Sequence, residues 1–115
     1  MSLRMLELES EGVTILKIDG RIVLGSESNA FREQMKILLA AGKTKIVLNM
    51  EHVSYIDSAG LGTLVAVYAS ARAGGTTLKL AQLGTLFAKM IQMTRLYTVF
   101  DVYPTETEAV QSFRT

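Results

Sequence analysis

Apolar residues recur along this chain at two spacings, one typical of strands and one typical of helices. Residues 5–9 alternate leucine with glutamate, which predicts a half-exposed strand, and the β-branched stretch 13–18 predicts a second strand paired with it in a hairpin. Residues 46–48, Ile-Val-Leu, are apolar on both faces, which is typical of a strand covered by helices on both sides. Two shorter strands are expected at residues 77–80 and 99–103.

Two long segments have the spacing of three and four residues that gathers apolar side chains on one helix face. The first begins at Ser26 or Ser28, either of which can cap it, and ends at Gly42, where a left-handed C-cap is expected. The second begins at Ser58 and is stopped by Gly74-Gly75. The inward positions assigned to these helices are Phe31, Met35, Leu38 and Leu39 in the first, and Leu61, Leu64, Val65, Tyr68 and Ala69 in the second.

Two further helices complete the pattern. The third opens at Gly84-Thr85, and the fourth follows a capping box at residues 105–108, Thr-Glu-Thr-Glu. Their inward positions are Leu86, Phe87, Met90 and Ile91 in the third, and Ala109, Val110 and Phe113 in the fourth. Strands that alternate with helices in this order predict a single α/β domain over residues 1–115, with a mixed, largely parallel sheet of four to five strands and about four helices. Residues 1–3 precede the first patterned segment and can derive from cloning.

Composition narrows the class of protein. The length of 115 residues is that of one domain, and 49% apolar with 20% charged residues is ordinary for a globular chain. Twelve basic against eleven acidic residues give a net charge of +1 with no basic stripe, so the footprint of a nucleic-acid binder is missing. The lack of cysteine excludes disulfides and thiolate metal sites. No apolar run is long enough for a signal peptide or a membrane span, so we expect a cytoplasmic protein without metal or cofactor.

Ser58 is the residue on which the chemistry depends, and it lies in the stretch Tyr-Ile-Asp-Ser-Ala-Gly-Leu-Gly-Thr-Leu. It follows the buried strand, at the edge where parallel sheets hold functional groups. Its side chain is a nucleophile, a helix cap or a site of reversible modification. A hydrolase elbow requires glycine where Ile56 stands, and the only histidine, His52, has no evident third partner that would orient it as a base. We therefore expect no enzyme activity, and a surface position for His52.

The other two roles differ in what they ask of the neighbouring residues. A cap at Ser58 contributes about 1 kcal/mol, but Gly60 and Gly62 in the first turn cost roughly 0.5 to 1 kcal/mol each, which a cap alone does not require. A phosphate on Ser58 would be tolerated at a helix N-terminus. The small side chains of Ala59 and Gly60 would leave the hydroxyl open to a kinase, and Asp57 adds a charge beside it.

The stretch from Val47 to Gly62 resembles the signature of the STAS domain family, above all in its Asp-Ser-Ala-Gly-Leu-Gly core. Within that family it is similar to the bacterial anti-sigma factor antagonists, and the resemblance extends to the opening hairpin, to residues 20–23 and to residues 94–97. The resemblance implies that an anti-sigma factor with serine kinase activity phosphorylates the serine. The unphosphorylated antagonist would bind this kinase and free the sigma factor, and a metal-dependent serine phosphatase would reverse the modification.

The resemblance also carries over a set of site residues. It implies that Ser58 is the phosphoacceptor and that the partner contacts are made by Asp57, Ser58, Ala59, Gly60, Leu61 and Gly62, with Gly25, Ser26 and Glu27 from the loop after the second strand. Many members have aspartate where this chain has Gly25. We expect Ala59, Gly60 and Leu61 to border the contact, so that Gly60→Trp would block binding and leave the fold intact.

We interpret the chain as an anti-sigma factor antagonist that phosphorylation of Ser58 switches off. Two alternatives remain at this stage. One is a STAS subunit that docks on a transporter or signalling scaffold without being phosphorylated. The other is a small serine hydrolase, which an active-serine reagent would trap.

Overall fold

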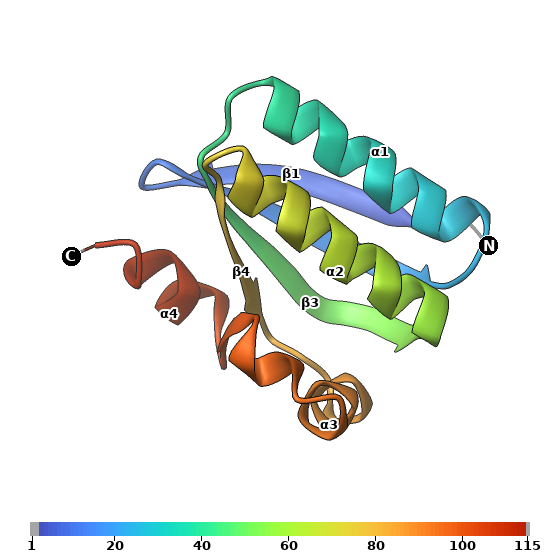
Figure 1. Ribbon diagram of the computed structural model, residues 1–115. Coiled ribbons are helices and arrows are strands. Elements are labelled where there is room, and N and C mark those ends of the chain that lie inside the picture. Colours follow the sequence, from blue (N-terminus) through green and yellow to red (C-terminus); the bar gives the residue numbers. More distant parts are fainter. Residues whose placement is uncertain (1–2, 115) are drawn as a thin grey trace.

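A five-stranded sheet in the order β1-β2-β3-β4-β5 forms the centre of the protein, and helices pack on both of its faces (Figure 1). The computed structural model describes residues 3–114. The strands are β1 (Arg4–Ser10), β2 (Val13–Ile22), β3 (Lys45–Ile56), β4 (Thr77–Ala81) and β5 (Asp101–Tyr103). The helices are α1 (Ser26–Ala40), α2 (Ser58–Ala73), α3 (Thr85–Met93) and α4 (Glu106–Gln111), with a 3-10 turn, η1, at Leu96–Thr98.

The sheet is mixed, as the sequence predicts. β1 pairs with β2 antiparallel in a hairpin, whereas the pairs β2–β3, β3–β4 and β4–β5 are all parallel. Each parallel connection passes through a helix, which is the usual form of the long crossover that a parallel pair needs. The predicted order of strands and helices is confirmed, and only the short turn η1 was not foreseen.

The two faces of the sheet are covered by different helices. Phe31, Met35 and Leu38 of α1 pack with Leu64 of α2 against one face, in a core that also takes Phe87 and Ile91 of α3. Ala109 and Val110 of α4 pack on the opposite face with Val47. Alternate residues of a strand point to opposite faces, so Ile46 and Leu48 join the first core while Val47 joins the second. The expectation that β3 is buried from both sides is confirmed.

β1 departs from the expected burial. Its leucines were expected on the buried face, yet Leu6 is 56% exposed and Leu8 is also exposed. Leu8 lies opposite Ile15, on the face that α4 covers, but α4 contacts mainly β3, β4 and β5 and leaves the β1 edge open. Of the three leading residues that the sequence sets apart, Met1 and Ser2 lie outside the described residues, and Leu3 is buried in the core.

Both long helices end as predicted and α2 begins at Ser58 as predicted, but the start of α1 differs from the prediction. Gly42 has a φ of 80° and Gly75 a φ of 86°, a left-handed conformation that suits glycine after a helix. Neither Ser26 nor Ser28 caps α1, whose N-cap is Gly25 with a φ of 103°. The Ser28 hydroxyl instead donates to the carbonyl oxygen of Val23 at 2.7 Å, so it ties the helix to the end of β2.

A buried lysine fixes α4 to the sheet. Lys79 of β4 is 7% exposed, and its ammonium nitrogen donates to the Ser112 hydroxyl at 2.7 Å and lies 4.3 Å from the centre of the Phe113 ring. Asp101 Oδ2 is 3.7 Å away and supplies the opposite charge. A buried ammonium is costly unless it is paired in this way, so these contacts make the closing segment part of the fold.

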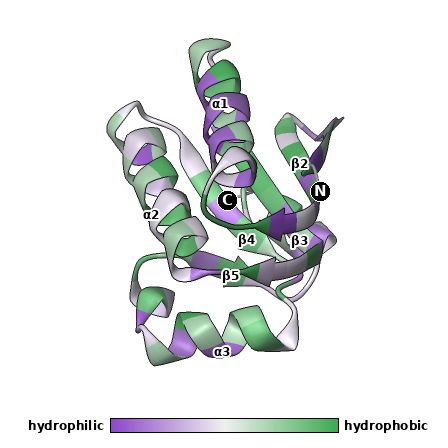
Figure 2. Ribbon diagram, turned by 90° about the vertical axis from the view of Figure 1, so that its right-hand side faces the viewer, coloured by the Kyte–Doolittle hydropathy of each residue, from purple (hydrophilic) through white to green (hydrophobic). Residues whose placement is uncertain are grey.

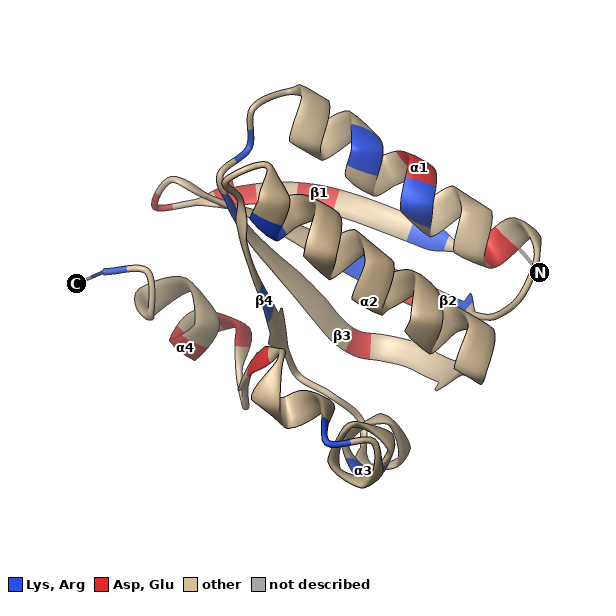
Figure 3. Cartoon of the chain, in the orientation of Figure 1, with Lys and Arg blue, Asp and Glu red and all other residues tan. Residues whose placement is uncertain are grey.

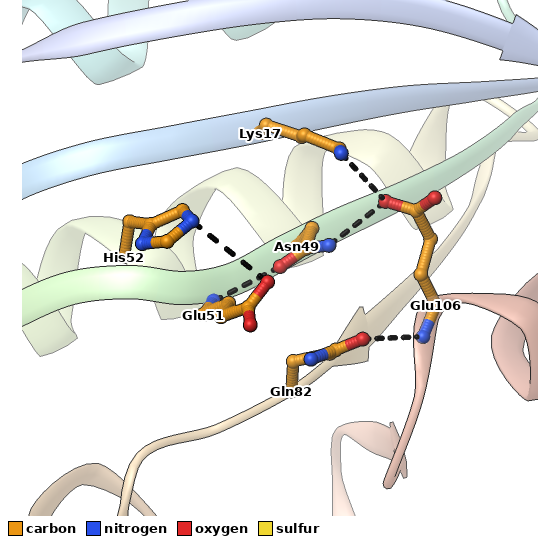
Figure 4. A network of polar contacts seen from close by, with 6 residues as sticks. All are labelled: Lys17, Asn49, Glu51, His52, Gln82 and Glu106. Atoms are coloured by element: carbon orange, nitrogen blue, oxygen red, sulfur yellow. Dashed lines mark hydrogen bonds and ion pairs between the residues drawn. The ribbon is translucent and has the colours of Figure 1, made fainter.

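A second polar cluster holds the start of α4 (Figure 4). Asn49 of β3 is buried, and its amide donates to Glu106 Oε1 at 2.8 Å, while the backbone N–H of Glu106 donates to Gln82 Oε1 at 3.1 Å. Lys17 Nζ lies 3.9 Å from the same carboxylate oxygen. Side chains from β2 and β3, and from the residue after β4, therefore meet at the first residue of α4.

The predicted capping box yields the first test. The Thr105 hydroxyl accepts a hydrogen bond from the backbone N–H of Glu108 at 3.0 Å. Thr105→Ala should lower the free energy of unfolding by about 1 kcal/mol, because that N–H loses its partner. Thr107→Ala is the matched control, since Thr107 is exposed in the same turn and should change stability by less than about 0.5 kcal/mol. Urea denaturation measures both, and equal effects would contradict the capping role.

Candidate functional site

The N-terminus of α2 is capped by Asp57, not by Ser58. Asp57 has an extended backbone and its Oδ1 accepts a hydrogen bond from the backbone N–H of Gly60 at 2.7 Å. Ser58 is the first residue of the helix itself. The interpretation of Ser58 as the cap is therefore wrong by one residue. The physical reason is the position of Asp57 directly before the helix. Its backbone carbonyl oxygen already accepts the first helical hydrogen bond, from the N–H of Leu61, and from there its side chain can accept from the free N–H groups of the first turn.

Asp57 also joins the two loops at this edge of the sheet. Its second oxygen, Oδ2, accepts from the backbone N–H of Leu24 at 3.1 Å, so one carboxylate holds both the start of α2 and the loop between β2 and α1. The N–H groups of Gly60 and Leu24 lower the pKa of Asp57, because they donate to its charged form. The carboxylate is thus ionised at neutral pH and fully used in holding the backbone.

Ser58 is left exposed and without a structural task. None of the hydrogen bonds among residues 3–114 uses its hydroxyl; Ala59, the next residue, has a small side chain, and Gly62, one turn on, has none. His52 lies in β3 and points to a different neighbour, with Nε2 3.8 Å from Glu51 Oε1 (Figure 4). Its predicted surface position is confirmed, and no hydrogen bond in the described chain joins it to Ser58.

Gly60 is required by a close approach of two backbones. It is buried, and a Cβ at this position would overlap the carbonyl oxygen of Ile22, the last residue of β2. The expectation that Gly60→Trp leaves the fold intact is therefore wrong, because no side chain of any size fits there. Leu61 is buried as well, so the two residues support the surface from below. Gly62, by contrast, faces open space.

The loop from Leu24 to Glu27 exposes a different set of residues from the one expected, which was Gly25, Ser26 and Glu27. Glu27 is only 8% exposed, and the pKa of its carboxyl is lowered by its own backbone N–H and by the Ser26 hydroxyl, which donates to it at 3.1 Å. Leu24 is 77% exposed and was not among the site residues that the sequence suggested. An isolated leucine in an otherwise small and polar loop was the available signal. We call the exposed residues Leu24, Gly25, Ser26, Ser58 and Gly62 the Ser58 surface.

The chain is similar in sequence to a known domain family. The sequence model of the STAS domain matches residues 7–109, and the chain belongs to the STAS domain family. A relative from Bordetella bronchiseptica, BtrV, bears the name of an anti-sigma factor antagonist and is 28% identical over 110 residues, which cover 90% of this chain and 95% of the relative. None of the helices formed by residues 3–114 has the length and apolar character needed to cross a bilayer.

Solved structures share the fold at lower identity. A Thermotoga maritima protein, also named as an anti-sigma factor antagonist, superposes with a TM-score of 0.88 at 23% identity, covering 96% of this chain and 95% of that one. The phosphorylated form of SpoIIAA from Bacillus gives 0.72 at 19% identity, over 96% and 100% of the two chains. A sulfate transporter family protein from Wolinella succinogenes gives 0.70 at 19% identity, over 89% and 84%. The predicted fold class is confirmed.

The two glycines of α2 make a matched pair for a test of the close approach. Gly60→Ala should lower the free energy of unfolding by roughly 1 to 3 kcal/mol, because its methyl group has to displace the Ile22 carbonyl. Gly62→Ala should raise it by about 0.5 to 1 kcal/mol, since alanine favours a helix and meets nothing there. Chemical denaturation of both variants decides the question, and effects of the same sign would contradict the assigned geometry.

The double acceptor role of Asp57 predicts a pH dependence of stability. A pKa that is lower in the folded than in the unfolded chain stabilises the fold above the unfolded value, and this contribution is lost as the pH falls through the folded pKa. Asp57→Asn has only one acceptor oxygen for two N–H groups, so its melting temperature should be lower than that of the wild type at neutral pH. The difference should shrink below about pH 4. A difference that stays constant into strong acid would show that the carboxylate charge is not what matters.

Proposed function

We propose that this protein is an anti-sigma factor antagonist whose binding to a serine kinase is switched off by phosphorylation of Ser58. The observation that carries the proposal is the exposed Ser58 hydroxyl, which no hydrogen bond of the described chain uses. Because Asp57 does the capping, a kinase can modify Ser58 without breaking a bond that the fold needs. The name of the relative BtrV supports the same function, as does the existence of a phosphorylated form of SpoIIAA, a protein with this fold.

The unphosphorylated protein binds through the Ser58 surface. The small residues around Ser58 let a partner backbone approach closely, and Leu24 offers an apolar side chain that is available for burial. Asp57 lies beneath this surface, and its two oxygens are already engaged by Gly60 and Leu24. A partner therefore meets a neutral hydroxyl above a fixed negative charge. Binding sequesters the kinase and releases its sigma factor, and a serine phosphatase restores the active form.

Phosphate changes binding far more than folding. It adds about −1.5 to −2 charges at the start of α2, where the helix dipole favours an anion, but beside the ionised carboxylate of Asp57. These two effects oppose each other, so the melting temperature should hardly move. In the complex the new charge and bulk meet partner groups arranged for a neutral hydroxyl, which costs several kcal/mol.

The test uses the serine kinase anti-sigma factors encoded in the genome of the source organism, each purified and incubated with this protein and ATP. Mass spectrometry should place a phosphate on Ser58 for the cognate kinase. Calorimetry should show that phosphorylation weakens binding by roughly two to three orders of magnitude. Ser58→Asp should lose less affinity in the same direction, because it carries about half the charge. Ser58→Ala should bind and not be switched.

Ser70→Ala is the matched control, because Ser70 is an exposed serine on the same helix, three turns away. It should be phosphorylated at Ser58 and bind as the wild type does. Failure of every such kinase to modify or bind the protein would refute the proposal and favour a docking role without phosphorylation. A phosphoprotein that binds as tightly as the wild type, or that loses binding only because it unfolds, would refute the switch.

A further inference from the structure

A groove of about 510 Å³ lies between the end of β3 and one side of α3, immediately before Ser58 in the chain. Residues 53–56 of β3 form one wall, and Ile56 is only two residues from Ser58. The facing wall comes from α3 and includes Leu86, Met90 and Met93. Leu86 is 64% exposed and Met93 is 84% exposed, so the helix presents apolar side chains to solvent along the groove. Figure 2 shows α3 apart from α1 and α2, with hydrophobic positions along its length.

The groove exists because β3 is longer than its neighbour. β4 pairs with residues 45–49 only, so residues 50–56 have a partner strand on the β2 side and none on the other. Residues 53–56 form no backbone hydrogen bonds with any described residue outside the sheet, so nothing in the described chain pairs with this side of the strand. An open strand edge with free N–H and C=O groups is a template for an added strand.

The charge of the groove is positive. From Gln82 to Phe100 the chain has two charged residues, Lys89 and Arg95, and no carboxylate (Figure 3). Lys89 lines the groove and Arg95 follows Thr94, which also lines it. Both side chains are exposed, and neither forms an ion pair with another residue of the described chain.

We infer that this groove binds an extended, apolar and acidic segment of the partner kinase, added as a strand to the free edge of β3. The inference rests on the proposed function, which supplies the partner. An added strand satisfies the free backbone groups of residues 53–56, which a helix in the groove would leave unpaired. Its apolar side chains cover Leu86 and Met93, and its carboxylates meet Lys89 and Arg95. Because the groove's wall on β3 ends at Ile56, two residues before Ser58, one partner can contact both, and the groove contributes affinity that phosphorylation does not remove.

The experiment compares matched variants in binding to the cognate kinase. Leu86→Ser/Met93→Ser should weaken binding at least tenfold, because few interface residues dominate affinity and these are the exposed apolar ones. Ile37→Ser is its control, since Ile37 is 60% exposed on α1 and does not line the groove. Lys89→Glu should weaken binding, whereas Lys45→Glu, at the other end of β3, should not. In all these variants phosphorylation of Ser58 should reduce affinity by the same factor as in the wild type.

Hydrogen exchange tests the added strand directly. Amides of residues 53–56 should exchange more slowly in the complex than in the free protein. Unchanged exchange there, or wild-type affinity of the Leu86→Ser/Met93→Ser variant, would overturn the inference while the switch at Ser58 could still be observed. A wild type that binds no kinase would overturn the proposed function and this inference together. A wild-type dimer that the double variant converts to a monomer would show that a second copy occupies the groove, which also overturns it.

Discussion

One carboxylate holds together the edge of the sheet where Ser58 lies. Asp57 accepts from Gly60 at the start of α2 and from Leu24 in the loop after β2, which are 36 residues apart in sequence. The same edge brings Gly60 against the carbonyl oxygen of Ile22 so closely that no side chain fits between them. These contacts hold the loop after β2 against the start of α2. The N–H groups of Gly60 and Leu24 already have Asp57 as their acceptor, so they do not draw in the Ser58 hydroxyl, which stays exposed.

Most of the fold follows from local patterns that the tertiary structure leaves in place. The apolar run Ile46–Leu48 has to be a central strand, because both of its faces need cover. Thr105 caps α4, and Gly42 ends α1, for reasons contained within a few residues of sequence. The site is less predictable. Which of Asp57 and Ser58 caps α2 depends on the exact start of the helix, and a shift of one residue decides which of the two is bound to the backbone and which is left exposed.

Other features depend on contacts between distant segments, which no local pattern contains. Gly60 resembles an accessible small residue in sequence, and only the end of β2 makes it a buried contact point. Leu6 and Leu8 have the alternation of a half-buried strand, but the length of α4 decides that they remain exposed. The groove beside α3 arises from the difference in length between β3 and β4, since a longer β4 would have filled it.

The α4 face of the sheet and its carboxyl edge differ in how their polar groups are paired. On the α4 face, Lys79 and Glu106 are enclosed by partners that satisfy them, so this face holds its charges in fixed pairs. At the carboxyl edge beside α2 and α3, the hydroxyl of Ser58 and the cations Lys89 and Arg95 have no such partners in the described chain. A charge added to the network of Lys79 or Glu106 would have to break its hydrogen bonds, which would lower the stability of the fold. A charge added at Ser58 breaks no hydrogen bond of the described chain, so under the proposed function its effect would fall on the binding of a partner. Under the proposed function, this separation would let phosphorylation of one side chain change binding by orders of magnitude and hardly alter the stability of the domain.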